Sequence, residues 1–520
     1  MADPVLIMDI EISKPVIRAR IQISIELMII FTGRQKKSVC LFFREKIMFY
    51  RLNPEYVLRG WEEMSWVLVR RPDNDVRLLT REMFQVLLLC DGETDLPGDL
   101  LDRNMCEELY RCEADGIICA SASPGRLEED QYYKYYHNRY TKSVFWSITG
   151  RCNFHCRHCY MDAPEAALGE LSTEEALDLI DQMAECGVLQ VDLTGGEPFV
   201  RKDFWELVDR ILSHKIVISQ IYTNGWLLSE KTLDEFEKRG LKPEINISFD
   251  GVGWHDWMRG TEGAEEASLR AMELCHKRGF PVSVAMCIHR GSSEVLPRTV
   301  KVLQAVGVTD IRVANVDKTD LWSRNSEGNA LTRREYIETV LPYVEWYYRE
   351  GRPIKRLVLG GVAQLYQDRP GEISIRHYDG TEKCKECYLC GAVRWSCYIT
   401  PEGRLLPCMP MTASPDQERF PRVQDIGLRR GLKDSYYMQF ADSRVKDLLA
   451  VNGECNSCKY RYECGGGCRA AALLTGEHDL MGCDRDMCMM WKEGYVERIL
   501  RTLDEVNAKY GMSEEKGGIY

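Results

Sequence analysis

Three cysteines stand close together in the segment CNFHCRHCY, which runs from residue 152 to residue 160. Cys152, Cys156 and Cys159 follow the spacing CxxxCxxC, and thiolates hold iron–sulfur clusters, which usually take four of them. Three thiolates leave one metal position open, as in a catalytic metal site that keeps a place for a ligand. The motif alone is also compatible with the remnant of a zinc site. The segment therefore predicts a metal centre with one open position.

Three short polar motifs follow at regular intervals, namely LTGGEP (193–198), YTNG (222–225) and INISFDG (245–251). The glycine pair Gly195 and Gly196 would let the backbone approach a ligand closely. Glu197 can accept from an ammonium group, and Ser248 and Asp250 can hydrogen-bond ribose hydroxyls. Each motif alone is more often a turn or a strand end. Their order after CxxxCxxC, one strand–helix unit apart, favours a shared binding site.

Strand-like and helix-like runs alternate along the segment that carries these motifs. The strand-like runs are 143–149, 189–194, 219–223, 244–249, 282–288 and 310–316, and the helix-like runs are 172–187, 201–214, 230–240, 265–279 and 296–307. This alternation predicts an α/β fold whose parallel sheet curls into a partial (β/α)6 TIM-like barrel. Functional residues of such barrels lie where strands end, and the motifs fall there.

Residues 143–345, with these motifs, closely resemble the radical S-adenosylmethionine (SAM) enzymes. The resemblance implies that the three cysteines hold a [4Fe–4S] cluster whose open iron binds the amine and carboxylate of SAM. An electron from the cluster would cleave SAM to a 5′-deoxyadenosyl radical, which abstracts a substrate hydrogen. The residues implied in SAM binding are His158 near adenine, Gly195, Gly196 and Glu197 at the amine, Ser248 and Asp250 at ribose, and Arg259 at the carboxylate. For Arg259 an exposed loop arginine is the alternative.

Half of the 22 cysteines lie in a loop-rich segment between Cys384 and Cys488. The segment shows little apolar periodicity beyond one predicted hairpin, CYITPEGRLLPC, so metal ligation is expected to stabilise it. A zinc ribbon is one alternative, because its CxxC pairs look similar. The other cysteines are predicted to be small core hydrophobes, namely Cys40, Cys90, Cys106, Cys112, Cys119, Cys186, Cys275 and Cys287.

The spacings C-x12-G-x4-C and C-x2-C-x5-C-x3-C in this segment resemble the SPASM extension of radical SAM proteins, which carries two auxiliary [4Fe–4S] clusters. Two closed clusters need eight thiolates, and the segment offers eleven. The resemblance implies one cluster on Cys384, Cys390, Cys408 and Cys468, and another on Cys455, Cys458, Cys464 and Cys483. Cys387 competes with Cys384 for its role, and Cys488 competes with Cys483.

Residues 48–125 predict a small α+β unit. SWVLVRR indicates a strand, LTREMFQVLLLCDG a helix ended by Gly92, and residues 96–118 two helical pieces and a short strand. This order and the phrase LCDGET resemble the winged-helix domain that recognises precursor peptides in ribosomal peptide pathways. That domain binds a leader peptide as an added strand. A structural domain without a peptide is the alternative.

The chain is thus expected to hold six parts: an N-terminal extension (1–47), a winged-helix-like peptide-recognition domain (48–125), a linker (126–142), the partial barrel (143–351), an auxiliary-cluster domain (352–490), and a final helix with a tail (491–520). The formal net charge of −12 argues against a nucleic-acid binder or a protein of anionic membranes. No apolar run is long enough to span a membrane, and no signal peptide is recognisable. A cytoplasmic protein is therefore predicted, in which clustered cysteines favour metal over disulfides.

Together these parts resemble the maturases of ribosomally made peptides, of the thioether-forming, sactipeptide-like type. The expected partners are a precursor peptide, whose leader binds the N-terminal domain, and a reductant such as flavodoxin or ferredoxin. A formylglycine-forming enzyme of the anaerobic sulfatase-maturating type is an alternative, but that family has an Asp where this chain has Met409. Carbon–carbon crosslinking of a peptide is another. A non-catalytic iron–sulfur electron carrier would not need the TGGEP and ISFDG motifs.

Overall fold

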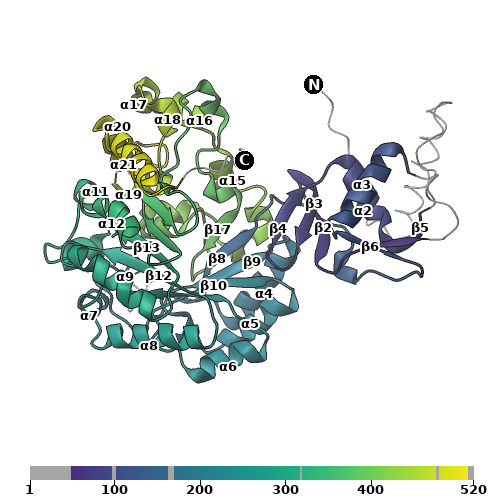
Figure 1. Ribbon diagram of the computed structural model, residues 1–520, viewed down its shortest axis with the longest axis horizontal. Helices are drawn as coiled ribbons and strands as arrows, with labels where there is room; N and C mark the ends of the chain where they lie inside the picture. Colours follow the sequence, from purple (N-terminus) through teal and green to yellow (C-terminus); the bar gives the residue numbers. More distant parts are fainter. Residues whose placement is uncertain (1–47, 97–100, 162–168, 317–318, 476–478, 513–520) are drawn as a thin grey trace. The chain divides into compact units, whose positions relative to one another are not determined.

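The computed structural model describes residues 48–96, 101–161, 169–316, 319–475 and 479–512 (Figure 1). The chain divides into two compact units. The first contains the residues up to Leu58 together with 66–133, and the second contains 59–65 and everything from Lys134 onwards. The predicted N-terminal extension, residues 1–47, lies outside the described residues, as does the tail beyond Met512.

The first unit combines strands and helices, as its sequence predicts. β1 (Phe49–Leu52), β5 (Asp91–Asp95) and β6 (Ile118–Ser121) form an antiparallel sheet in the order β5-β1-β6. β3 (Met64–Arg70) pairs with β4 (Asp75–Leu78), and α2 (Arg81–Leu89) packs against α3 (Arg103–Ala114). Leu87 of α2 and Leu109 of α3 are buried in the core of this unit.

One local prediction in this unit is wrong. The helix expected to end at Gly92 ends at Leu89, because Gly92 belongs to β5. Its φ is 76°, and a Cβ there would lie 1.9 Å from the carbonyl oxygen of Gly125, so only glycine fits this close approach. Of the two helical pieces expected within residues 96–118, α3 is present, and residues 97–100, which precede it, lie outside the described residues.

The second unit contains the predicted partial barrel. Its parallel strands are β8 (Ser143–Ser147), β9 (Gln190–Thr194), β10 (Val217–Thr223), β11 (Glu244–Ser248), β12 (Val282–Ile288), β13 (Asp310–Asn315) and β14 (Arg356–Leu359). The connecting helices are α4 (Thr173–Glu185), α5 (Phe204–Ser213), α6 (Glu230–Lys238), α8 (Ala264–Lys277) and α9 (Leu296–Ala305), which flank the sheet in Figure 1. All six predicted strands are present, and the α/β fold class is confirmed.

Apolar periodicity accounts for this arrangement. In α5 the buried residues Phe204, Leu207, Val208 and Ile211 recur on one helical face, which packs against the sheet. Strands alternate between faces. In β8, for example, Val144 and Trp146 are buried while Phe145 between them is only half-buried.

Further strands extend the sheet at both edges. Antiparallel β15 (Ala363–Tyr366) and β16 (Glu372–Ile373) follow β14, and β17 (Ser396–Ile399) lies parallel to β8 at the other edge. β18 (Leu405–Leu406) pairs antiparallel with β17, which confirms the predicted hairpin. Because β17 comes from the cysteine-rich segment, that segment is anchored directly to the first barrel strand.

The remaining helices are short, except for α21 (Tyr495–Lys509) with 15 residues. They include α7 (His255–Arg259), α10 (Asp320–Asn325), α11 (Arg333–Val340), α12 (Pro342–Arg349), α16 (Val445–Val451), α17 (Gly453–Ser457), α18 (Arg461–Cys464), α19 (Arg469–Thr475) and α20 (Arg485–Lys492). One helix was predicted where α20 and α21 stand. The chain breaks it at Gly494, which has a φ of 76°. Within the part of the chain that the structure describes, no helix has the length and apolarity that a membrane crossing requires.

Candidate functional site

Cys152, Cys156 and Cys159 lie in the loop that follows β8, and all three are half-buried. Burial, reinforced by nearby Cys156 and Glu197, raises the pKa of the Cys152 thiol to about 12. The backbone N–H of Phe154 donates to the Cys152 sulfur over 3.4 Å. Three thiols within electrostatic reach of one another, with a backbone donor aimed at one of them, fit the ligation of an iron–sulfur cluster.

The glycine pair of the LTGGEP motif, Gly195 and Gly196, joins the cysteine loop to β9. The N–H of Gly196 donates to the carbonyl of Thr149, and the N–H of Glu197 donates to that of Arg151, each over 2.9 Å. A Cβ on Gly196 would lie 2.2 Å from the Arg151 oxygen. The two glycines therefore permit a close approach between the motif and the loop that carries the cysteines.

Glu197 is fully buried beside the cysteine loop. Its carboxylate accepts from the hydroxyl of Thr223 (2.8 Å), from the N–H of Asn224 (2.8 Å) and from the N–H of Phe199 (3.3 Å). Burial raises the pKa of this carboxyl to about 7, even though these donors oppose the rise. The YTNG motif thus positions the carboxylate of the LTGGEP motif. This carboxylate is a hydrogen-bond acceptor next to Cys152.

Asp250 and Arg259 form a buried ion pair, with 2.6 Å between Oδ2 of Asp250 and Nε of Arg259. The other carboxylate oxygen of Asp250 accepts from the N–H of Cys287 over 2.9 Å. Burial opposes ionisation of Asp250, but the guanidinium holds the pKa of this carboxyl well below its usual range. Arg259 Nη1 also lies 3.7 Å from the Cys156 sulfur, so Arg259 is no exposed loop arginine.

The ion pair yields a stability prediction. Asp250→Ala would leave the Arg259 guanidinium buried without its partner, which should lower the free energy of unfolding by about 3–5 kcal/mol. Asp209→Ala is the matched control, because Asp209 pairs with Arg239 but its side chain is 57% exposed, and its loss should cost less than about 1 kcal/mol. Urea unfolding of both variants measures the difference, and equal costs would contradict the prediction.

His158 lies on the same side of the barrel as this pair. Burial lowers the pKa of its imidazole to about 3, so the ring is neutral. Ligand atoms of His158, Asp250 and Cys287 lie within 4.8 Å of one another. Such a trio could hold a metal ion, but the Arg259 guanidinium beside Asp250 disfavours a cation there. Ser248, the remaining predicted residue, is half-buried at the end of β11.

Sequence reasoning missed several residues around His158. Cys287 was predicted to be a core hydrophobe, yet it is half-buried beside His158 and Asp250. His289 is fully buried, and its ring centroid lies 4.9 Å from that of Trp257 and 6.4 Å from that of Trp322. Their position in the sequence could have indicated them. Cys287 and His289 stand at the end of β12, just as the recognised motifs stand at the ends of their strands.

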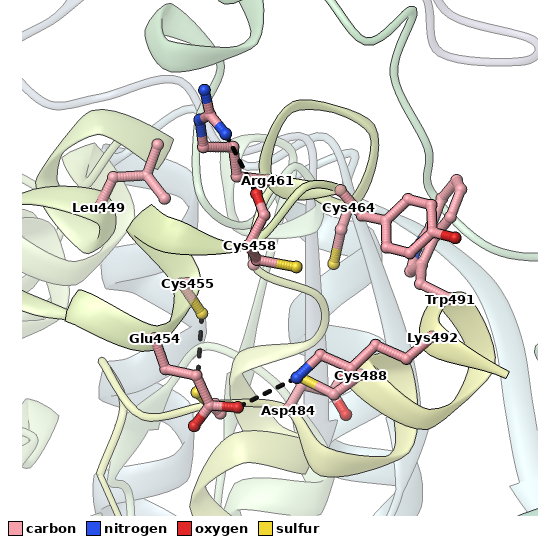
Figure 2. A pocket seen from close by; sticks show the side chains of 13 residues that line it. Leu449, Glu454, Cys455, Cys458, Arg461, Cys464, Asp484, Cys488, Trp491 and Lys492 are labelled. Carbon is pink, nitrogen blue, oxygen red and sulfur yellow. Dashed lines mark hydrogen bonds and ion pairs between the residues drawn. The ribbon is translucent and has the colours of Figure 1, made fainter.

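Five cysteines of the extension line one cavity: Cys455, Cys458, Cys464, Cys483 and Cys488. Figure 2 shows this cavity, with Cys455, Cys458, Cys464 and Cys488 labelled. They come from α17, α18, α20 and the loops between them. The sulfurs of Cys455 and Cys483 are 3.7 Å apart, and Asn452 Nδ2 lies 3.6 Å from the Cys483 sulfur. Cys483 is almost fully buried, whereas Cys488 is half-buried on α20.

Three more cysteines, Cys390, Cys408 and Cys468, line a second cavity that reaches the ends of β13 and β14. Cys384 was expected to join them, but it is buried in a small apolar cluster with Leu389 and Leu448, against which Cys387 packs. Cys397 is buried within β17 in the main core. The thiols of the extension therefore gather in two cavities, with Cys384 and Cys387 beside them.

Comparison with known proteins gives relatives of this chain. A family model for the radical SAM superfamily matches residues 146–303. The chain is 32% identical over 338 residues to the PqqA peptide cyclase of Granulibacter bethesdensis, covering 64% of this chain and 84% of that protein. It is 26% identical over 349 residues to the AdoMet-dependent heme synthase of Methanosarcina barkeri, covering 64% and 93%.

Solved structures also resemble this chain. Streptococcus suis SuiB bound to the precursor peptide SuiA matches with a TM-score of 0.60 and 14% identity, covering 85% of this chain and all of that one. At so low an identity the likeness concerns the fold.

Proposed function

Because this chain belongs to the radical SAM superfamily, we propose that it is an oxidoreductase that modifies a ribosomally made precursor peptide. Membership of that superfamily implies a [4Fe–4S] cluster and SAM as cofactors. The observation that carries the proposal is the combination of a three-thiol loop beside Glu197 with two further thiol-lined cavities in the same unit. A cytoplasmic location, where free thiols stay reduced, is part of the proposal.

The roles of the radical-site residues follow from their geometry. Cys152, Cys156 and Cys159 would hold the cluster, and the Glu197 carboxylate, fixed by Thr223 and Asn224, would accept from the amine of SAM. When bound, cluster and SAM supply the 5′-deoxyadenosyl radical that removes a hydrogen atom from the peptide. Arg259, 3.7 Å from the Cys156 sulfur, would meet the SAM carboxylate, and His158, Ser248 and Asp250 would surround its nucleoside.

The extension would supply electron acceptors for a net oxidation. We assign Cys455, Cys458 and Cys464 to one auxiliary [4Fe–4S] cluster, with Cys483 as the fourth ligand because its sulfur already lies 3.7 Å from that of Cys455. Cys390, Cys408 and Cys468 would hold the other cluster, and Cys384, which lies in the apolar cluster with Leu389, is the expected fourth ligand.

The bond that we propose is a thioether. A peptide thiolate would bond to the carbon radical left by hydrogen abstraction, with the loss of one electron. Cys455, Cys458 and Cys464 would hold the auxiliary cluster that supplies an acceptor for this electron. The balance closes, because one electron enters to cleave SAM and one leaves as the carbon–sulfur bond forms. The peptide loses one carbon-bound hydrogen and one thiol proton. A flavodoxin or ferredoxin is the class of reductant that would supply the entering electron.

The first unit would capture the leader of the peptide. β5 and β6 form the edges of its three-stranded sheet, and a peptide can add to a sheet edge as a further strand. The likeness in fold to SuiB, a protein whose structure holds its precursor peptide, supports this assignment. The part boundaries expected from the sequence, with peptide recognition in 48–125 and auxiliary clusters in 352–490, belong to the same proposal.

Two relatives favour other reactions of the same radical. The identity of 32% to a PqqA peptide cyclase favours carbon–carbon crosslinking of a peptide, and the identity of 26% to a heme synthase favours a tetrapyrrole substrate. Electron acceptors in the thiol-lined cavities would serve the crosslinking of a peptide and the oxidation of a tetrapyrrole equally well. Met409 after Cys408 counts against formylglycine formation.

Binding of SAM should depend on pH through Glu197. Its pKa of about 7 means that the carboxylate is ionised above pH 7 and neutral below it. Because a neutral carboxyl accepts less well from the amine, the affinity advantage of the wild type over Glu197→Gln should shrink about tenfold between pH 8 and pH 6. Equilibrium binding of SAM to both proteins measures this ratio, from which the titration of SAM itself cancels. A constant ratio would contradict the prediction.

The function is tested by co-expression with a short, cysteine-containing peptide encoded by an open reading frame that neighbours this protein's gene. Mass spectrometry should find a peptide that has lost two hydrogen atoms for each crosslink, with one cysteine per crosslink resistant to alkylation. Loss of two hydrogens with all cysteines still alkylated would favour the carbon–carbon reaction. An unmodified peptide, together with conversion of an added porphyrin, would favour the heme reaction.

A further inference from the structure

The two thiol-lined cavities of the extension share a dividing wall, formed by Gly466, Gly467, Arg469 and Asp484. Gly466 lines the cavity of Cys455, Gly467 and Arg469 line that of Cys468, and Asp484 lines both. The wall is tight, because a Cβ on Gly467 would lie 2.7 Å from Oδ2 of Asp484. Asp484 therefore faces both proposed cluster sites. Arg469, which lines the cavity of Cys468, donates to the carbonyl of Gly466, which lines the other cavity.

Arg469 places a fixed positive charge in the dividing wall and is only 2% exposed. Its guanidinium donates to the carbonyls of Leu480 (3.0 Å) and Gly482 (2.8 Å), and also to that of Gly466. Nε has no hydrogen-bond partner among the described residues. These carbonyl partners satisfy donors but carry no net charge. A buried cation is costly without an opposite charge nearby, so the guanidinium is expected to have an anionic counterpart.

Opposing charge on the wall itself comes from Asp484. Its carboxylate accepts from the N–H groups of Cys468 (2.8 Å) and Met487 (2.9 Å). It is a single carboxylate, whereas two clusters, each with four thiolates, would bring several negative charges. Because the guanidinium donates to the carbonyl of Gly466, its positive charge also lies next to the cavity of Cys455. Arg469 would thus stabilise anionic sulfur in either cavity.

We propose that Arg469 raises the reduction potentials of both auxiliary clusters and so makes them acceptors for the electron released when the peptide is oxidised. A cluster gains negative charge when it is reduced, and its potential depends on nearby charge, hydrogen bonds and exposure. A fixed cation in a buried wall favours the reduced state of both. This inference rests on the proposed function, because it requires both auxiliary clusters. Arg469 would act on the reaction only through the reduction potentials of the two clusters, without contacting the peptide.

Redox titration of the reconstituted full chain, followed by electron paramagnetic resonance, tests the proposal. Arg469→Gln should lower both auxiliary potentials enough to change the oxidised-to-reduced ratio at fixed potential about tenfold, which is about 59 mV for one electron. Arg469→Lys keeps the charge but cannot reproduce the planar fork to three carbonyls. The auxiliary reduction potentials of Arg469→Lys should stay close to those of the wild type. Equal shifts of these potentials in both variants, or no shift in Arg469→Gln, would overturn the proposal.

A matched control is Arg201→Gln. The Arg201 guanidinium is also buried and donates to the carbonyls of Leu171 (3.0 Å) and Ile148, but it lies beside the barrel strands. Its removal should leave both auxiliary potentials unchanged. An auxiliary shift as large as that of Arg469→Gln would mean that any loss of a buried arginine moves the potentials, and would overturn the assignment.

Two measurements on the wild type separate this inference from the proposed function. About four irons per chain, rather than about twelve for three clusters, would overturn the proposed auxiliary clusters and the inference with them. Three clusters with auxiliary potentials at or below that of the Cys152 site would overturn the inference alone. The expected result is three clusters with both auxiliary potentials above it, and this check holds even if the Arg469 variants do not fold.

Discussion

Replacing Cys152, Cys156 and Cys159 together by alanine is expected to abolish the formation of 5′-deoxyadenosine from SAM. The three thiols lie within electrostatic reach of one another in the loop after β8, and without them no iron can be held beside Glu197. With dithionite and SAM under anaerobic conditions, the wild type should accumulate 5′-deoxyadenosine, and the triple variant should stay at the level of a protein-free sample. Liquid chromatography with mass detection measures the product.

Cys397→Ala is the control for this experiment. Cys397 is buried in β17 within the main core and belongs to neither thiol-lined cavity, so its removal should lower stability but leave SAM cleavage intact. Product from the triple variant at the wild-type rate would show that the radical is generated elsewhere. Equal loss in the control would point to a general effect of removing a cysteine.

Replacing Cys455 and Cys458 by alanine is expected to separate SAM cleavage from peptide oxidation. By the proposed assignment, SAM cleavage would depend on the loop after β8, whereas the released electron would pass to an acceptor held by the thiols of the extension. The variant should still form 5′-deoxyadenosine, but crosslinked peptide should fall to the background. Both products are quantified in one reaction, and crosslinking at the wild-type ratio to 5′-deoxyadenosine would contradict the assignment of the auxiliary cluster.

Single variants in the same cavity decide its fourth ligand. The Cys483 sulfur lies 3.7 Å from that of Cys455, and Asn452 holds it there, so Cys483→Ala should lose the cluster signal. Cys488→Ala, which changes the half-buried thiol of α20, should keep it. The reverse pattern in iron content and in the paramagnetic spectrum would exchange the two assignments.

The barrel could be predicted from the sequence because its strands and helices carry strong, regular apolar patterns. α5 shows this pattern directly, with Phe204, Leu207 and Ile211 on one face. Boundaries set by single glycines were harder to predict. Gly92 joins a strand where a helix end was expected, and Gly494 divides the last helix in two. In both cases a positive φ decides the structure, and apolar periodicity carries no information about it.

The candidate site was predictable where a motif occupies consecutive residues, and less so where tertiary contacts assemble it. The sequence did indicate Glu197, but its partners Thr223 and Asn224 become meaningful only once β9 and β10 lie side by side. The pairing of Asp250 with Arg259 depends on the fold of α7 against β11. The division of the C-terminal thiols between two cavities was expected from the resemblance to the SPASM extension. The exception is Cys384, which the structure places in an apolar cluster with Leu389 and Leu448.

The central claim, that a SAM-derived radical from this site oxidises a peptide, is tested most directly by isotope transfer. The reconstituted wild type would be given SAM, a reductant and its precursor peptide with deuterium on carbon throughout. The expected result is one molecule of singly deuterated 5′-deoxyadenosine for each crosslink found in the recovered peptide. Unlabelled 5′-deoxyadenosine with an unaltered peptide would contradict the claim, because SAM would then be cleaved without the peptide as its substrate.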